Sequence, residues 1–189
     1  HPVLLDELLD PRTLYIPPET EQIKIDLHQR IKQVPKDDPE HQIEQMCVFK
    51  DVNVLRVAAA DVTGALPLMK VSDHLSDIAE TVLAEVVGVA YAHLLDKHGA
   101  PISQLDGKKC EKGFAVIAYG KLGGLELGYG SDLDLVFLHA GGNEKTRGAQ
   151  QAIDSAQFFN RLGQRVIHTL TAHTRAGKLY EIDMRLRPS

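Results

Sequence analysis

The chain has 189 residues and a formal net charge of −5, with no run of basic residues. That length allows one large or two small domains with a real core. The acidic balance argues against a nucleic acid as partner, because polymer binding normally needs a cationic track. Cys47 and Cys110 form no CxxC spacing, so neither a disulfide framework nor a zinc site is expected, which suits a reducing cytosol. No apolar run reaches the length of a membrane span and no signal peptide is visible, so we expect a cytoplasmic chain with no membrane partner.

Helical patterns dominate the first hundred residues. Pro11, Pro17 and Pro18 make residues 1–18 an irregular lead-in, with room for a short helix over Leu4–Leu9. A helix is predicted after Pro18 from its apolar stripe: Ile23, Leu27, Ile31 and Val34. The segment 35–39 ends it, and Asp38 as N-cap with Pro39 at the first helical position predicts a second helix from about Glu40 to Val62.

A third helix is indicated by apolar residues that recur at helical spacing from Leu75 to Leu95. Ser72 is its predicted N-cap and Gly99 its predicted end. Polar residues return on every turn, so the pattern favours a core-facing helix of a bundle over a coiled-coil or membrane helix.

The pattern changes from Pro101 onward. A polar connection over residues 101–113 precedes two predicted buried strands, Phe114–Tyr119 and Asp132–Leu138. A loop at 141–148, a helix from about 152 to 172 and an alternating strand over 178–187 follow. We therefore predict an α+β fold, with an N-terminal helical bundle (1–100) packing on a small mixed-sheet core (101–189) that is truncated at its C-terminal side.

Two aspartates and a glycine-rich turn mark the candidate site. Leu133 separates Asp132 from Asp134, so both carboxylates point to one face of a strand. Their apolar neighbours make an unpaired carboxylate costly, which favours a cation such as Mg²⁺ between them. If the strand over 178–187 lies alongside, Asp183 completes a three-carboxylate site suited to Mg²⁺ and a triphosphate. The turn before Asp132 has glycine at 120, 123, 124, 128 and 130, as a backbone with positive φ or close ligand approach requires.

These residues resemble a known signature. Gly120-Lys121, ten residues and then Asp132-Leu133-Asp134 is similar to the motif of the nucleotidyltransferase superfamily that includes DNA polymerase β, although Lys121 stands where Ser or Gly is usual. The longer strings over 119–135 and 180–188, with the opening 1–10, resemble the glutamine synthetase adenylyltransferase family. Its bifunctional members add AMP to glutamine synthetase and remove it, and Lys at that position is normal among them.

The resemblance implies a metal-dependent transfer of AMP from ATP to a tyrosine of glutamine synthetase, with a polymerase β-like core. Asp132, Asp134 and Asp183 would be the catalytic residues and the Mg²⁺ ligands. The implied nucleotide contacts are Gly120, Lys121, Gly123, Gly124, Gly130, Ser131 and Arg185. Glutamine synthetase as protein substrate and a PII signalling protein as partner follow from the resemblance alone. The string Gly128-Tyr129-Gly130 before Ser131 is similar to the adenylylating, C-terminal half, whereas the removing half typically has Asn-Phe-Ser there.

Other interpretations stay open. The glycine-rich turn could be a tight connection, and the Asp pair could be solvated edge residues. Glu181 fits a salt-bridge lattice, while Arg185 or Arg187 could anchor phosphates. Ser131 could contact phosphate or only shape its turn. The alternative functions are the deadenylylating half, a small-molecule nucleotidyltransferase and a non-catalytic ATP-binding module. The pairs His93/His98 and His168/His173 are five residues apart, which forms no two-histidine metal clamp on a helix.

Overall fold

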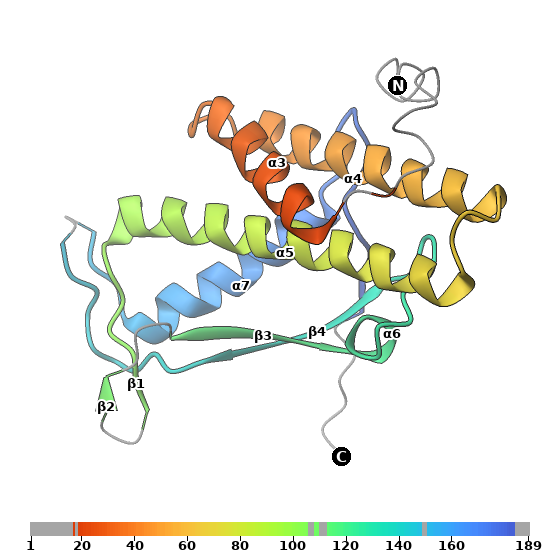
Figure 1. The fold of residues 1–189 in the computed structure, drawn as a ribbon. Coiled ribbons are helices and arrows are strands. Elements are labelled where there is room, and N and C mark those ends of the chain that lie inside the picture. Colours follow the sequence, from red (N-terminus) through yellow and green to blue (C-terminus); the bar gives the residue numbers. More distant parts are fainter. Residues whose placement is uncertain (1–16, 18, 106–107, 110–112, 149–150, 184–189) are drawn as a thin grey trace.

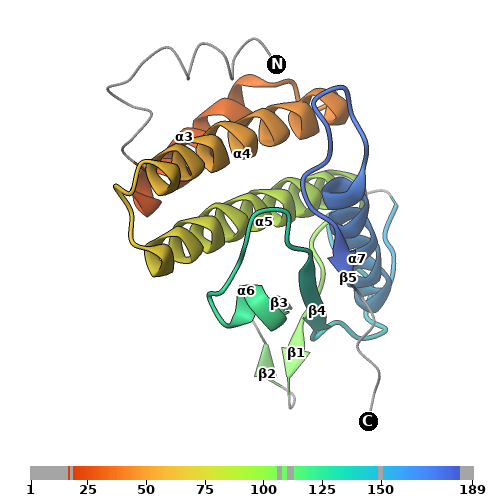
Figure 2. The same ribbon diagram turned by 90° about the vertical axis from the view of Figure 1, so that its right-hand side faces the viewer.

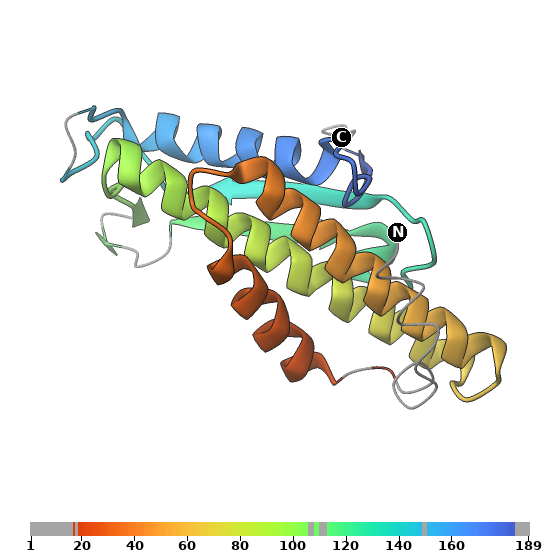
Figure 3. The ribbon, with the colours of Figure 1, turned by 90° about the horizontal axis from the view of Figure 1, so that it is seen from above.

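Helices and a small sheet form separate layers in a computed structural model, which describes residues 17, 19–105, 108–109, 113–148 and 151–183. α3 and α4 lie over α5, and α5 and α7 lie between them and the sheet (Figures 1 and 2). Seen from above, α7 runs along the sheet beside α5 (Figure 3). The mixture of helices and a three-stranded mixed sheet confirms the predicted α+β class.

The three long helices begin and end close to the predicted positions. α3 spans Thr20–Gln33 and α4 spans Pro39–Val62. Asp38 caps α4 as expected, because its side chain accepts a hydrogen bond from the backbone N–H of His41 at 3.1 Å. α5 spans Leu68–His98 and ends at Gly99, whose φ of 75° is the left-handed conformation that glycine adopts easily. The predicted N-cap at Ser72 was wrong, since α5 begins directly after Pro67.

α5 is also long and apolar enough to cross a membrane. Met69–His98 has a mean hydropathy of 1.5 over its most apolar window, which corrects the expectation that no segment reaches that length. Length and composition alone do not separate a core helix from a membrane helix. Here the buried stripe of α5, which includes Leu75, Ile78 and Val82, belongs to the same core as α3, α4 and α7.

The sheet has the order β3-β4-β5. β3 (Phe114–Tyr119) pairs antiparallel with β4 (Leu133–His139), and β4 pairs parallel with β5 (Ile182–Asp183). α6 (Gly120–Gly123) joins the first two strands, and α7 (Ser155–Thr171) is the crossover to β5. The expected strand over 178–187 is therefore described as a strand only at Ile182–Asp183, and Arg185 and Arg187 lie outside the described residues.

A second, two-stranded sheet was not expected. β1 (Gln104–Leu105) and β2 (Lys108–Lys109) pair antiparallel inside the segment predicted as a polar connection. Strands of two residues carry no periodicity for a sequence pattern to detect.

The helices cover one face of the main sheet. Leu133 and Leu135 of β4 point into the core, where they join the fully buried Phe158 and Leu162 of α7. Because successive strand residues alternate between faces, the neighbouring positions of β3 and β4 lie on the other face. Ile117, Tyr119 and Leu138 there keep 38%, 49% and 55% of their surface exposed. We call this the open face of the sheet.

Candidate functional site

Asp134 and Asp183 share the open face of the sheet, and Asp132 lies directly before it in the chain. Asp134 pairs in register with Asp183 across β4 and β5, while Leu133 pairs with Ile182 on the core side. Asp132 immediately precedes β4 and is two residues from Asp134, so strand alternation places it on the same side. The structure thus brings Asp134 and Asp183 together in register, both half-buried, and places the exposed Asp132 directly before β4.

Gly120 makes room for the Asp134 carboxylate. We call the end of the sheet at Asp132, Asp134 and Asp183 the acidic edge. Tyr119, at the end of β3, pairs with Asp134 across the sheet, and the chain turns sharply at Gly120, where φ is 55°. A methyl group at Gly120 would collide with the Asp134 carboxylate. Both the left-handed backbone and the missing side chain are needed here, so the Gly120–Asp134 spacing of the sequence motif is a physical contact in the structure.

The next glycines serve the packing of α6. A Cβ at Gly123 would lie 2.5 Å from the carbonyl oxygen of Ala118, and one at Gly124 would lie 3.4 Å from the carbonyl oxygen of Gly120. Gly123 therefore lets α6 fold back on β3, a reason for glycine that sequence reasoning, which looked to phosphate approach, did not give. Lys121 is exposed on the same turn, and the buried Leu122 anchors it.

The loop that leads to Asp132 is held by its own hydrogen bonds and by α4. Ser131 Oγ accepts from the backbone N–H of Gly128 at 3.1 Å, so this side chain does shape the turn. Gly130 has a φ of 71°. Tyr129 donates from its hydroxyl to the Asp61 carboxylate at 3.1 Å. Partial burial and the bond to Asp61 raise the pKa of Tyr129 to about 12.

Lys50 of α4 fixes the segment that enters β5, and sequence reasoning missed it. Its Nζ donates to the carbonyl oxygens of Lys178 at 3.0 Å and Leu179 at 3.1 Å, and it lies 5.6 Å from the ring centre of Tyr180. Burial raises the pKa of Tyr180. A signal was present in the sequence, because Lys50 falls on the apolar stripe of its helix, four residues after Met46.

A cavity of about 370 Å³ lies between this segment, the loop at Leu127–Ser131 and α4. Lys50, Tyr129 and Glu181 are among the residues that line it. Glu181 forms an ion pair with Lys178, in keeping with the salt-bridge interpretation. The cavity adjoins the acidic edge, since Ser131 in its wall is followed directly by Asp132.

The carboxylates share a face but do not form a closed metal cage. Within the described part of the chain, no group of three or more His, Cys, Asp or Glu side chains converges closely enough to hold a metal ion. The donor set nevertheless suits Mg²⁺, which takes oxygen ligands and completes its shell with water and substrate phosphates. Arg185, the remaining predicted nucleotide contact, lies outside the described residues.

The fold and this edge define an α+β protein with paired carboxylates beside a glycine-rich turn. A family model for glutamate-ammonia ligase adenylyltransferases matches residues 1–189, and the chain belongs to that family. It is 54% identical to a protein of Thioalkalivibrio sulfidiphilus, 51% to one of Nitrosococcus oceani and 50% to one of Pseudomonas aeruginosa. Each of these is named bifunctional glutamine synthetase adenylyltransferase/adenylyl-removing enzyme.

These similarities cover all of this chain but only part of the relatives. The match takes in 100% of the chain and 20%, 20% and 19% of the three proteins, respectively. The chain thus spans about a fifth of the length of the curated relatives that it matches. Family membership is established over that stretch.

Proposed function

We propose that this chain carries the transfer site of an enzyme that moves AMP from ATP onto a tyrosine of glutamine synthetase. The observation that carries the proposal is the in-register pairing of Asp134 with Asp183 on the open face, with Gly120 against the Asp134 carboxylate and Asp132 directly before the same strand. The names of the relatives support the choice of substrate. A cytoplasmic location, a PII protein as signalling partner, and no nucleic acid or membrane partner belong to the same proposal.

The three aspartates are the residues that would hold Mg²⁺. When bound there, the ion would neutralise charge on the phosphate oxygens of ATP. Asp134 and Asp183 occupy paired positions on neighbouring strands, so the backbone, and not a long side chain, sets their separation. That rigidity suits a site in which charge has to be placed before the reaction begins.

The glycine-rich segment would receive the phosphates. Lys121 is exposed beside Gly120 and supplies a positive charge for the β- and γ-phosphates. A side chain added at Gly130 would meet nothing within 4 Å, so backbone is open to a ligand at that point. Ser131 uses its oxygen as an acceptor within the turn, which leaves the hydroxyl proton to donate to a phosphate oxygen. Gly123 supports this surface, because it lets α6 pack against β3.

In the transfer itself, the phenolic oxygen of the acceptor tyrosine forms a bond to the α-phosphorus of ATP. The bond from the α-phosphorus to the oxygen bridging to the β-phosphorus breaks, and pyrophosphate leaves in line. The phenol gives up its proton in this exchange. Asp183 lies beside Asp134 on the neighbouring strand and would take up this proton, so that the acceptor attacks as the tyrosinate.

We assign the chain to the adenylylating, C-terminal half of the bifunctional enzyme. The support is the string Gly128-Tyr129-Gly130 before Ser131. In the structure Tyr129 has a definite role in this string, because its hydroxyl ties the loop to Asp61 of α4.

The test is transfer of label from α-phosphate-labelled ATP in a full-length protein that contains this sequence. Glutamine synthetase should become labelled, and Asp134→Asn should lower the rate by roughly a hundredfold or more, since one preorganised charge at the reacting centre is lost. The fold should persist, with a slightly higher melting temperature because carboxylate repulsion falls.

Three results would contradict the proposal. Near-normal turnover of Asp134→Asn with Mg²⁺ would remove the carboxylate site. Label on small hydroxyl compounds but not on glutamine synthetase would indicate a small-molecule nucleotidyltransferase. ATP binding without any transfer would indicate a binding module.

A further inference from the structure

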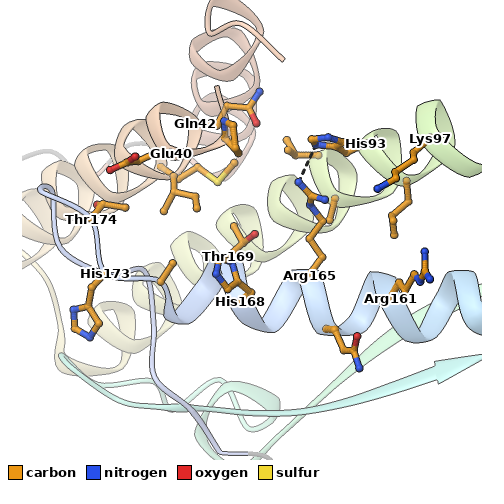
Figure 4. A pocket seen from close by; sticks show the side chains of 18 of the residues that line it. Glu40, Gln42, His93, Lys97, Arg161, Arg165, His168, Thr169, His173 and Thr174 are labelled. Carbon is orange, nitrogen blue, oxygen red and sulfur yellow. Dashed lines mark hydrogen bonds between the residues drawn. The ribbon is translucent and has the colours of Figure 1, made fainter. Parts of the chain in front are cut away.

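A larger cavity lies at the other end of the helices. It has a volume of about 830 Å³ and is walled by the start of α4, the last turns of α5, α7 and the turn after α7 (Figure 4). Neither the acidic edge nor the glycine-rich segment 120–131 contributes to its wall. The proposed transfer reaction therefore leaves this cavity without a role.

Positive charge dominates the wall. Lys97, Arg161 and Arg165 line the cavity, and Glu40 is the one carboxylate among the described lining residues. Figure 4 shows both arginines extending from α7 toward α5, while Glu40 is drawn at the opposite end of the view from Lys97. In a chain of net charge −5, this is a local reversal of sign. Such a concave surface concentrates counter-ions.

The two arginines are held by histidines. Arg165 donates from Nη2 to Nδ1 of His93 at 2.9 Å, and Arg161 donates from Nη1 to Nε2 of His98 at 3.0 Å. The Nδ1 atom of the buried His98 lies 2.9 Å from the carbonyl oxygen of Gln151 and donates to it. Its Nε2 then carries the lone pair that accepts from Arg161.

The two histidines bring no negative charge to the arginines. Burial and the nearby Arg165 guanidinium lower the pKa of His93, so this ring is uncharged near neutral pH. Within the part of the chain that the structure describes, neither Arg161 nor Arg165 forms an ion pair with a carboxylate. The histidines orient the guanidinium groups but do not compensate their charge. Half-buried, uncompensated charge is costly, and an anion between the two groups would remove that cost.

The spacing of the arginines suits one ligand. Arg161 and Arg165 are four residues apart on α7, so they project from the same side of the helix, one turn apart. Each guanidinium has five N–H donors arranged as a planar fork, of which the histidine contact uses one. Two such forks match the oxygens of a phosphate or carboxylate group better than two ammonium groups would.

We propose that this cavity binds a small organic anion, whose phosphate or carboxylate group is held by Arg161 and Arg165. Met46, Val89 and Leu94 contribute an apolar part of the wall, which takes the carbon body of the ligand. The volume lies in the range of sites for small organic molecules.

Calorimetric titration of the full chain tests the site, with phenyl phosphate, benzoate and uncharged benzyl alcohol as probes. Both anions should bind saturably and benzyl alcohol should not. The double variant Arg161→Gln with Arg165→Gln should lose about tenfold or more in affinity for the anions. Arg175→Gln should bind like the wild type, because Arg175 is exposed and is not part of the wall. The tighter of the two anionic probes identifies the preferred acid group.

The variant Lys121→Met distinguishes this cavity from the transfer site. Its affinity for the anionic probes should equal that of the wild type. A drop in affinity with Lys121→Met but not with the double variant would place anion binding at the glycine-rich segment and overturn the proposal. So would equal affinity of wild type and double variant, or no anion binding at millimolar concentration. Should the double variant lack its native circular dichroism, Arg165→Lys replaces it. That variant keeps the charge without the fork and should bind more weakly than the wild type, and equal affinity would count against the proposal.

Discussion

At the scale of single residues, the glycines of the segment 120–131 have different tasks. Gly120 leaves space for a carboxylate that belongs to the site, whereas Gly123 leaves space for the backbone of β3. The sequence alone predicted either a positive φ or close ligand approach for both, because a glycine-rich string does not reveal what each missing side chain would have met. The contact partner, and not the residue type, decides which function a substitution harms.

Gly123→Val should therefore unfold more easily than the wild type, as well as bind ATP less well. A branched side chain has to displace the Ala118 carbonyl, and overpacking of this kind costs about 1–3 kcal/mol. Chemical denaturation measures the loss. Gly128→Ala is the matched control, because its new Cβ would lie at an ordinary 3.5 Å from Ser131 Oγ. Equal stability of Gly123→Val and wild type would show that α6 does not depend on this contact.

Tyr129 offers a prediction in alkaline solution. Its pKa is raised to about 12 in the folded chain, above the ordinary value of about 10. The raised pKa contributes stability that is fully present below about pH 10 and is lost as pH rises through the folded pKa. The contribution is small because 47% of Tyr129 is exposed.

Asp61→Asn removes the charge that Tyr129 faces, so the pKa of Tyr129 should fall toward its ordinary value. Phenolate absorbance during a pH titration reports this, with Tyr129→Phe identifying the component that belongs to Tyr129. The contact between α4 and the loop would be refuted if the titration curve of Asp61→Asn matched that of the wild type.

At the scale of elements, α4 positions both halves of the site. Asp61 near its end accepts from Tyr129 of the glycine-rich loop, and Lys50 near its middle donates to the segment before β5. The apolar stripe predicted α4 correctly, and the pair Asp38-Pro39 predicted its cap. Lys50 stands out on that stripe as a charged residue, but the partners of these polar contacts could not be predicted. They are distant in sequence and, for Lys50, are backbone carbonyls with no residue signature.

Lys50→Met should lower AMP transfer in the full-length protein and destabilise the fold by about 1–3 kcal/mol. The fold is destabilised because the carbonyl groups of Lys178 and Leu179 lose their donor. Transfer falls because Asp183 follows four residues after Leu179 and depends on the position of this segment. Transfer assays and denaturation curves measure the two effects. Lys32→Met on exposed α3 surface should change neither. Normal activity of Lys50→Met would show that the position of β5 is set by other contacts.

At the scale of the whole molecule, the cavity with the arginines and the acidic edge draw on different ends of the same helices. α4 contributes Glu40 and Met46 to the cavity and Lys50 and Asp61 to the neighbourhood of the acidic edge. The predicted division at residue 100 stays a prediction, and the buried residues on both sides of it belong to a single core cluster. Hydrophobic periodicity predicted the long helices because it reports which residues are buried. It carries no information about where two neighbouring helices diverge and leave a cavity.

The direction of the reaction is tested on the full-length enzyme. With Asp132 and Asp134 both changed to Asn, addition of AMP to glutamine synthetase should stop, while phosphate-dependent removal of AMP should continue at its normal rate. Two assays on one preparation, labelled transfer and phosphorolysis, measure this. The opposite pattern, removal lost and addition kept, would assign the chain to the other half.

The contact between Lys50 and Lys178 spans 128 positions of the chain, and this has a consequence for how the protein is made. During synthesis α3, α4 and α5 emerge first and can pack on one another through contacts close in sequence, which form quickly. The segment with Lys178 and Asp183 leaves the ribosome later and has to close a long loop onto α4. Until then Asp134 cannot pair with Asp183. We therefore expect pulse-labelled hydrogen exchange during refolding to protect the amides of α5 before the backbone N–H of Leu133, which donates to the carbonyl oxygen of Glu181 at 2.9 Å. Simultaneous protection of both would show that the acidic edge does not wait for its last strand.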